Sequence, residues 1–292
     1  MADELHMISS LDQLSDWCAV VPNLKRTGEN AWESAGGADI SYPADGLTQL
    51  ADVEPESYWF AHRNAVIAAV VERFPPTGPI FDIGGGNGFV SLGLTRAGFP
   101  CVVVEPDKSG IASVRRRGLP SIMAAFEDLH IPSNSIPAAG LFDVIEHIED
   151  EATTLAHLHE VLQPGGMAYI AVPAYNFLWS AEDVHAGHFR RYTVARLRRA
   201  MQAAGFEPLF GTSIFAILVP AVFARRTLPS LFSLRRGGSG VGAGEHHLPA
   251  SALGRSVAGL LDGELRRIRA GRAVPIGTSC FVVARKRGGL RQ

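Results

Sequence analysis

Cysteine is scarce in this chain, and long apolar runs are missing. Three cysteines, Cys18, Cys101 and Cys280, stand far apart among 292 residues. Their odd number and wide spacing argue against a disulfide framework and a cysteine-bound metal, and are typical of a reducing compartment. The longest apolar run, residues 214–224, is too short to span a bilayer, which needs about 20 residues. Residues 1–5 are acidic and lack the apolar core of a signal peptide, so we expect a cytoplasmic protein.

Acidic side chains are rare in the last third of the chain. Residues 187–292 contain 18 lysines and arginines but 4 aspartates and glutamates, which gives this part +14 within a chain of net charge −2. The excess favours an anionic partner, while the lack of interleaved aromatic residues argues against nucleic acid. We therefore expect a small-molecule, glycan or lipid-linked substrate, with an anionic one in best agreement with the charge. The apolar stretch within 214–236 has basic ends, which predicts either a peripheral membrane contact or a buried helix or lid.

The order of apolar runs indicates the fold class. With 47% hydrophobic and 19% charged residues, the chain is globular. Short apolar strands alternate with amphipathic helices such as the one expected at 56–74, which predicts an α/β fold with a mainly parallel sheet and helices on both faces. The strands are expected just before Gly84 and at residues 101–105, 121–124, 136–142, 167–172, 207–213 and 279–284.

The most informative segment is the glycine turn after the first of these strands. It reads Asp-x-Gly-x-Gly-x-Gly, with Asp82 followed by Gly84, Gly86 and Gly88. Glycine lets the backbone approach a ligand closely, and an acidic residue at the end of the next strand, here Glu105, can accept hydrogen bonds from ribose hydroxyls. The spacing differs from the Gly-x-Gly-x-x-Gly of dinucleotide sites, and a carboxylate at the mouth of the turn would repel a pyrophosphate. The pattern therefore predicts a nucleoside pocket and disfavours a nucleotide-dependent oxidoreductase.

Several motifs in this order resemble those of the class I S-adenosylmethionine-dependent methyltransferases. They are the glycine turn at 81–88, then residues 104–107, 127–129, 143–147 and 162–166. The resemblance implies a Rossmann-like sheet of seven strands. It also implies a core at 56–213, completed by the last strand and a basic tail at 276–292. Residues 1–55 are then expected to be an N-terminal extension or cap over the mouth of the site, and residues 214–275 a helical lid or substrate insertion.

The resemblance also implies which residues bind S-adenosylmethionine. Asp82 and the backbone around Gly84 and Gly86 would hold its amino-acid end, and Glu105 the ribose. Phe126 and Glu127 would flank the adenine, although plain core packing is an equal alternative for Phe126, and the family often has an acidic residue where Ala125 stands here. The complete predicted set is Asp82, Gly84, Gly86, Asn87, Glu105, Pro106, Phe126, Glu127 and Asp143.

An acid/histidine cluster follows the fourth core strand. Its segment 143–147 resembles that of metal-dependent small-RNA 2′-O-methyltransferases and of ubiquinone-pathway O-methyltransferases. That resemblance implies a divalent ion, Mg²⁺, Mn²⁺ or Zn²⁺, on Asp143, Glu146, His147 and His188. Without a metal, His147 or His188 would be the general base, because imidazole titrates near neutral pH. Arg191, with Arg190 beside it, would then orient the substrate.

The expected function is transfer of a methyl group to a nucleophile, a hydroxyl oxygen in the first instance. Two alternatives stay open at this point. One is an N- or C-methyltransferase acting on a peptide or natural product. The other is a noncatalytic methyltransferase-like module that binds a partner. The sequence does not predict the acceptor or the oligomeric state, because the same fold and cofactor motifs serve many acceptors.

Overall fold

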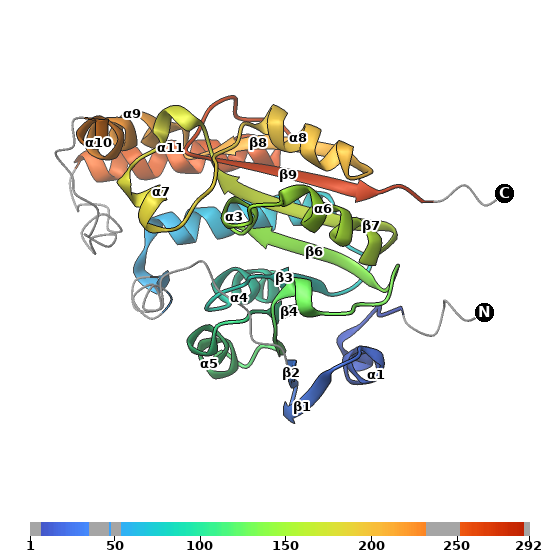
Figure 1. The fold of residues 1–292 in the computed structure, drawn as a ribbon. Helices are drawn as coiled ribbons and strands as arrows, with labels where there is room; N and C mark the ends of the chain where they lie inside the picture. The colour runs from blue at the N-terminus through green and yellow to red at the C-terminus, as the bar shows by residue number, and fades with distance from the viewer. Residues whose placement is uncertain (1–6, 35–46, 48–53, 232–251, 289–292) are drawn as a thin grey trace.

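A nine-stranded sheet forms the centre of the protein in a computed structural model (Figure 1). The structure describes residues 7–34, 47, 54–231 and 252–288. Within the sheet the strand order is β1-β2-β5-β4-β3-β6-β7-β9-β8. The strands are β1 (Leu24–Gly28), β2 (Ala31–Ser34), β3 (Ile80–Ile83), β4 (Cys101–Val104), β5 (Ser121–Met123), β6 (Ile136–Phe142), β7 (Leu162–Pro173), β8 (Phe206–Ile214) and β9 (Ser279–Lys286).

The seven predicted strands are confirmed, and two more join them. From β2 to β7 neighbouring strands run parallel, whereas β1, β9 and β8 pair antiparallel with their neighbours. The expected count of seven was wrong because β1 and β2, from the N-terminal extension, form a hairpin that adds to β5. Most of β1 is exposed and carries Lys25, Arg26 and Thr27, so it lacks the apolar alternation by which a strand is recognised in a sequence.

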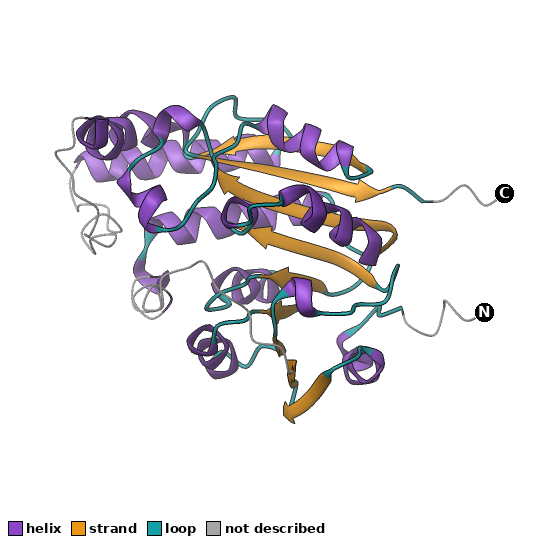
Figure 2. Cartoon of the chain, viewed as in Figure 1, coloured by secondary structure: helices purple, strands orange, loops and turns teal. Residues whose placement is uncertain are grey.

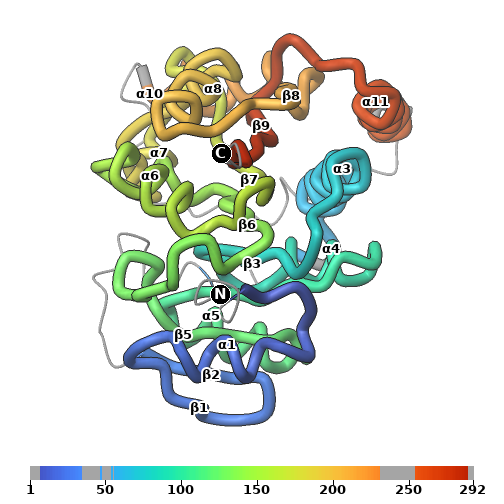
Figure 3. Tube along the Cα trace, turned by 90° about the vertical axis from the view of Figure 1, so that its right-hand side faces the viewer, coloured from blue at the N-terminus to red at the C-terminus, as the bar shows by residue number. Residues whose placement is uncertain are grey.

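Helices cover both faces of the sheet, as Figures 2 and 3 show. One face is covered by α1 (Leu14–Val20), α6 (Glu151–Val161) and α8 (Val194–Ala203), whose apolar side chains join the larger core cluster. The other face is covered by α3 (Tyr58–Arg73), α4 (Phe89–Arg96), α5 (Lys108–Arg116) and α11 (Ala252–Arg269). Successive residues of a strand point to opposite faces; in β6, Leu141 enters the first cluster and Phe142 the second. Thr193 caps α8, as the sequence suggests, by accepting a hydrogen bond from the Arg196 amide over 3.1 Å.

The described parts of 214–275 consist largely of helices, and the expected role as a lid or substrate insertion stays a prediction. After β8 come a short helix, η7 (Ala216–Leu218), then α9 (Val219–Val222), a π-helical turn, η8 (Phe223–Thr227), and α10 (Leu228–Leu231). By contrast α11 packs against α3, and its Glu264 accepts hydrogen bonds from the amides of Phe215 and Ala216 over 2.7 and 2.8 Å. This helix therefore completes a core layer and ties the start of the insertion to it.

The expected membrane contact through 214–236 stays a prediction. Residues 232–236 lie outside the described residues. Within the described part of the chain, no helix combines the length and the apolar character needed to cross a bilayer.

The N-terminal residues were expected to cap the site, and the described ones mostly pack elsewhere. Ile8, Leu14 and Trp17 are buried in the larger core cluster. Leu47 does reach the glycine turn, because its carbonyl accepts a hydrogen bond from Asn87 Nδ2 over 2.7 Å. Residues 35–46 and 48–53 lie outside the described residues.

The carboxyl ends of the parallel strands share one edge of the sheet. In Figure 1 the arrowheads of β6 and β7 point left, toward α7 (Ala181–His185) and α10. In folds of this kind ligands bind outside these strand ends. The segments that follow β3, β4 and β6 therefore form the candidate site.

Candidate active site

The glycine turn after β3 has the bare, left-handed backbone that its sequence predicts. Gly84, Gly86 and Gly88 have φ angles of +64°, +52° and +72°, a region that side-chain-bearing residues rarely adopt. A Cβ on Gly84 would lie 2.9 Å from Cγ2 of Val144, so a larger residue there would push the turn away from the segment that follows β6. The turn and this segment are thus direct neighbours.

Glu105 faces the turn from the end of β4, as the sequence predicts. Its Oε2 accepts a hydrogen bond from the Gly86 amide over 2.8 Å, and its Oε1 accepts one from the Asp107 amide over 2.9 Å. Burial raises the pKa of the Glu105 carboxyl to about 7, despite these two hydrogen bonds. Glu105 thus lies against the main chain of the turn, at the position from which an acidic residue can bind a ribose diol, and the Leu47 side chain lies over the same turn.

Asp82 and Asn87 brace the turn with their side chains. Asp82 is buried beneath the turn and accepts a hydrogen bond from Ser91 Oγ over 2.6 Å. Burial raises its pKa to about 6. The Asn87 amide donates to Leu47 O over 2.7 Å and to Glu54 Oε1 over 3.3 Å. Both side chains therefore have protein partners that hold the turn in shape.

The residues predicted to flank the adenine divide into two groups. Pro106 is half-buried directly after Glu105, where a nucleoside could contact it. The Phe126 ring instead stacks on His157 of α6, with 4.6 Å between centroids, inside the larger core cluster. Glu127 is exposed. Phe126 thus packs in the core, which is the alternative that the sequence left open.

Glu146, His147 and His188 come together beyond the carboxyl end of β6. The first two lie in the short helix η5 (Ile145–His147), and His188 follows α7. One potential ligand atom from each residue lies within 4.8 Å of those of the other two, and the two imidazole rings meet edge to face at 4.7 Å. The Phe189 amide donates to Glu146 O over 2.8 Å, which holds the two segments together.

Glu146 is the least solvated member of this cluster. Its side chain is fully buried, and neither carboxylate oxygen accepts a hydrogen bond from another described residue. Burial, reinforced by the nearby Asp143 charge, holds the pKa of the Glu146 carboxyl well above its usual range. Burial also lowers the pKa of His147 to about 4, and the neighbouring His188 adds to this effect. A buried acid without partners beside two imidazoles is a costly arrangement, which points to a ligand.

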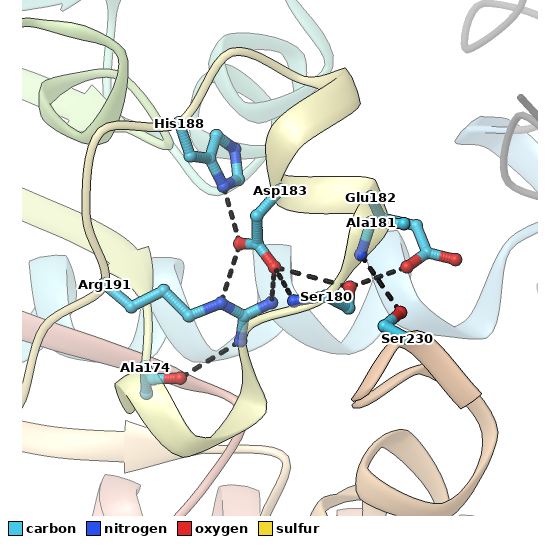
Figure 4. Close-up of polar contacts among 8 residues, drawn as sticks. All are labelled: Ala174, Ser180, Ala181, Glu182, Asp183, His188, Arg191 and Ser230. Carbon is cyan, nitrogen blue, oxygen red and sulfur yellow. Dashed lines mark hydrogen bonds and ion pairs between the residues drawn. The ribbon is translucent and has the colours of Figure 1, made fainter. Parts of the chain in front are cut away.

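Asp183 orients His188, as Figure 4 shows. Its Oδ1 lies 2.8 Å from His188 Nδ1. Arg191 binds the same carboxylate in a fork, from Nε to Oδ1 over 2.7 Å and from NH2 to Oδ2 over 2.9 Å. The Ser180 amide donates to Oδ2 over 2.8 Å. Burial alone would raise the pKa of Asp183, but the hydrogen bonds from His188 and Arg191 lower it to about 2.

An ionised Asp183 can only accept hydrogen bonds, so His188 must carry its proton on Nδ1. Its other nitrogen, Nε2, then presents a lone pair away from Asp183.

Asp143 was predicted both as a cofactor residue and as a metal ligand, and its side chain forms an ion pair outside the three-residue cluster. Its Oδ2 pairs with Arg63 NH2 over 2.7 Å, and it is not among the three clustered residues. The Asp143 backbone is left-handed, with φ of +59°. Its amide donates to Ala171 O over 2.8 Å. This backbone turn directs the side chain to α3 rather than to the histidines.

Comparison with known proteins identifies the family. A family model described as a methyltransferase domain matches residues 59–209, more than half of the chain. The chain belongs to the methyltransferase domain family. It is a class I S-adenosylmethionine-dependent methyltransferase, with S-adenosylmethionine as its cofactor.

Individual relatives agree with this assignment. Over 204 residues the chain is 23% identical to a probable S-adenosylmethionine-dependent methyltransferase of Mycobacterium tuberculosis, covering 68% of this chain and 74% of the relative. It is 25% identical over 170 residues to a probable S-adenosylmethionine-dependent methyltransferase of Mycolicibacterium smegmatis, covering 56% of this chain and 65% of the relative. A Thermotoga maritima methyltransferase structure, described as a possible histamine N-methyltransferase, covers 85% of this chain and is itself covered completely, with 15% identity and a TM-score of 0.53. This last likeness concerns the fold.

The predicted substrate-orienting role of Arg191 in this methyltransferase does not match its contacts. The guanidinium is buried, and its NH1 donates to Ala174 O over 3.1 Å in addition to the fork on Asp183. Arg191 therefore holds Asp183 in place and is a positioning residue. Arg190 also has protein partners, since its NH2 donates to Glu149 O over 2.6 Å.

Sequence reasoning missed Asp183 and Arg63. Asp183 stands three residues after Ser180, a spacing typical of a helix-capping pair. The sequence therefore indicated that Asp183 caps a helix, but it did not indicate the contact with His188. Arg63 and Asp143 are far apart in the sequence, and each alone is an ordinary charged residue. Contacts of this kind depend on the fold and carry no sequence pattern.

Proposed function

We propose that this methyltransferase transfers its methyl group to a hydroxyl oxygen of a small-molecule, glycan or lipid-linked acceptor. The observation that supports this proposal is the cluster of Glu146, His147 and His188, in which Asp183 holds His188 with Nε2 as its proton acceptor. Val144 lies between the glycine turn and this cluster, so cofactor and acceptor sites adjoin.

A hydroxyl acceptor makes chemical use of such a cluster. Methyl transfer is an in-line displacement in which the oxygen–carbon bond forms as the carbon–sulfur bond breaks. S-adenosylhomocysteine leaves, and the hydroxyl proton must go to a base. His188 Nε2 takes this proton in the proposed reaction, and the Asp183 carboxylate stabilises the imidazolium that results. The rest of the catalysis is positioning, because the sulfonium is already activated.

The side chains present also fit a divalent ion. Glu146 contributes buried carboxylate oxygens that accept no hydrogen bond from another residue in the described ranges, and His147 and His188 contribute one ring nitrogen each. One carboxylate with two imidazoles suits Mn²⁺ or Zn²⁺ better than Mg²⁺, which prefers oxygen ligands. When bound, such an ion would lower the pKa of an acceptor hydroxyl. Glu146, His147 and His188 would hold it, with Asp183 orienting His188 from behind.

Matched acceptor pairs test the proposal. The protein is incubated with S-adenosylmethionine and with pairs of compounds in which one member carries a hydroxyl where the other carries an amine. The formation of S-adenosylhomocysteine is then measured. We expect turnover with hydroxyl acceptors, its loss in His147→Ala and His188→Ala, and cofactor affinity close to that of the unchanged protein in both variants. Turnover with amines that survives both substitutions would instead support N-methylation.

A further inference from the structure

A pocket of about 540 Å³ is lined in part by the loop that follows His188, and it has no role in the chemistry described so far. It is lined by Asn176, Trp179, Phe189, Arg190 and Arg196. Its volume is comparable to that of small-molecule sites, roughly 300–1,000 Å³, but the hollow is open to solvent and not an enclosed cavity. These residues come from the short helix η6 (Asn176–Leu178), the residue directly after it, the loop after His188, and α8.

The pocket is joined to the acceptor site through one loop. Phe189 directly follows His188, and its amide donates to Glu146 O over 2.8 Å. The Phe189 ring is 48% exposed at the pocket wall. The loop that carries His188 thus also forms part of the wall of this pocket.

The pocket wall carries an excess of positive charge. Arg190 and Arg196 share a single carboxylate, Glu151, at 3.4 and 3.6 Å. The same carboxylate also accepts a hydrogen bond from the Tyr192 hydroxyl. The Asp150 carboxyl also interacts with Arg190, so among the described residues Arg196 depends on the shared Glu151 alone for its ion pair. Arg196 is the more accessible of the two, with 41% of its side chain exposed against 16% for Arg190.

The other polar groups of the wall are also hydrogen-bond donors. Within the described part of the chain, neither the Asn176 side-chain amide nor the Trp179 indole N–H makes a hydrogen bond. Both can donate, as can both guanidiniums, and no acidic side chain lines the pocket. The wall thus combines hydrogen-bond donors with two aromatic surfaces, those of Trp179 and Phe189.

We propose that this pocket binds an oxyanion, phosphate or carboxylate, of a ring-containing acceptor whose hydroxyl is methylated. Arg196, Asn176 and the Trp179 indole bind the oxyanion, because guanidinium and N–H donors pair with charged oxygens strongly. The acceptor ring packs on Trp179 and Phe189. The methylation of the bound molecule rests on the proposed function. The binding of its oxyanion in the pocket does not.

Binding is tested on the full chain saturated with S-adenosylhomocysteine, where no transfer can occur. The probes are phenyl phosphate, benzoate, neutral benzyl alcohol and inorganic phosphate. Affinities come from calorimetry, and the indole N–H resonance of Trp179, assigned with Trp179→Phe, reports the place of binding. Arg196→Gln removes a charge from the wall. Arg199→Gln removes the same charge from an exposed position of the same helix and is the matched control.

We expect phenyl phosphate or benzoate to shift the Trp179 resonance and to bind on the order of tenfold more tightly than benzyl alcohol and inorganic phosphate. Whichever of the two binds more tightly identifies the oxyanion. Arg196→Gln should weaken the anion by a similar factor, and Arg199→Gln should not. If Arg196→Gln fails to fold, Asn176→Asp places a negative charge in the wall and should weaken only the anions.

Equal affinity for benzyl alcohol, equal losses in the two arginine variants, or an unmoved Trp179 resonance would overturn the proposal. None of these results would affect hydroxyl methylation itself, which is measured by S-adenosylhomocysteine formation.

Discussion

Asp183 Oδ1 accepts a hydrogen bond from His188 Nδ1 over 2.8 Å, and this contact fixes which nitrogen of His188 is available for chemistry. Asp183 lies in α7 and His188 follows that helix, so the pair is local in sequence. Residues of the same segment hold the carboxylate in place, because Arg191 and the Ser180 amide donate hydrogen bonds to it. A fixed tautomer is a requirement both for a general base and for an imidazole that binds a metal ion.

Replacing Asp183 by asparagine should therefore remove activity without removing the fold. The amide can no longer be a pure acceptor, so His188 loses its preference for the Nδ1-protonated tautomer. We expect kcat to fall at least about tenfold, with unchanged affinity for S-adenosylmethionine. Imidazole nitrogen chemical shifts measure the tautomer directly. Glu182→Gln, on the same helix, is the control; a normal tautomer in Asp183→Asn would refute the positioning role.

Asp183 should also affect how the free energy of unfolding changes at acidic pH. Its pKa is lowered to about 2 in the folded protein from 3.8. A lowered carboxyl pKa stabilises the fold at pH values above about 4, and this contribution is lost as the pH falls through about 2. The size should be about 2 kcal/mol. Urea unfolding between pH 5 and pH 2 should show a smaller loss in Asp183→Asn than in the unchanged protein, and parallel curves would contradict the assignment.

The carboxyl of Glu105 should have the opposite effect on the pH dependence of stability. Burial raises its pKa from 4.5 to about 7, so in the cofactor-free protein its stabilising contribution is complete below about pH 4.5 and lost as the pH rises through about 7. Glu105→Gln should thus increase the free energy of unfolding at pH 8, by roughly 3 kcal/mol at most. The same substitution should weaken S-adenosylmethionine binding, since the ribose loses its charged acceptor.

Glu127→Gln provides the comparison for Glu105, because Glu127 is an exposed carboxylate that the sequence also assigned to the cofactor. Calorimetric titration with S-adenosylmethionine should show little change in this variant. A loss of S-adenosylmethionine affinity as large as that of Glu105→Gln would support the assignment of Glu127 to the adenine site.

The sequence was most informative where local pattern determines structure. The seven core strands are apolar runs bounded by helices and turns, and the turn at Gly84 requires a backbone that glycine adopts readily. Glu105 was found because its distance from the turn is set by one helix and one strand. The hairpin of β1 and β2 was missed because its short strands are largely polar, and they are stabilised by pairing with β5.

The site was hardest to predict where a side chain had a choice of partners. Asp143 and Arg191 carry the charges expected of a metal ligand and a substrate clamp, but each has a protein partner of opposite charge, Arg63 and Asp183. Phe126 has the same character whether it packs on a ligand or on His157. Only the three-dimensional arrangement decides among such partners.

The ion site offers a prediction that separates Glu146 from Asp143. If Glu146, His147 and His188 bind a divalent ion, the protein treated with a chelator should bind Mn²⁺ or Co²⁺ with about one ion per chain, measurable by calorimetry and, for Co²⁺, by its visible absorption. Glu146→Gln should weaken this binding at least about tenfold, because a ligand oxygen loses its charge. Asp143→Asn should leave it nearly unchanged, since Asp143 pairs with Arg63. Loss of the ion in Asp143→Asn would return that residue to the ligand set. If the unchanged protein binds no ion at millimolar metal, His188 acts as a base alone, and its activity should then persist in the presence of chelator.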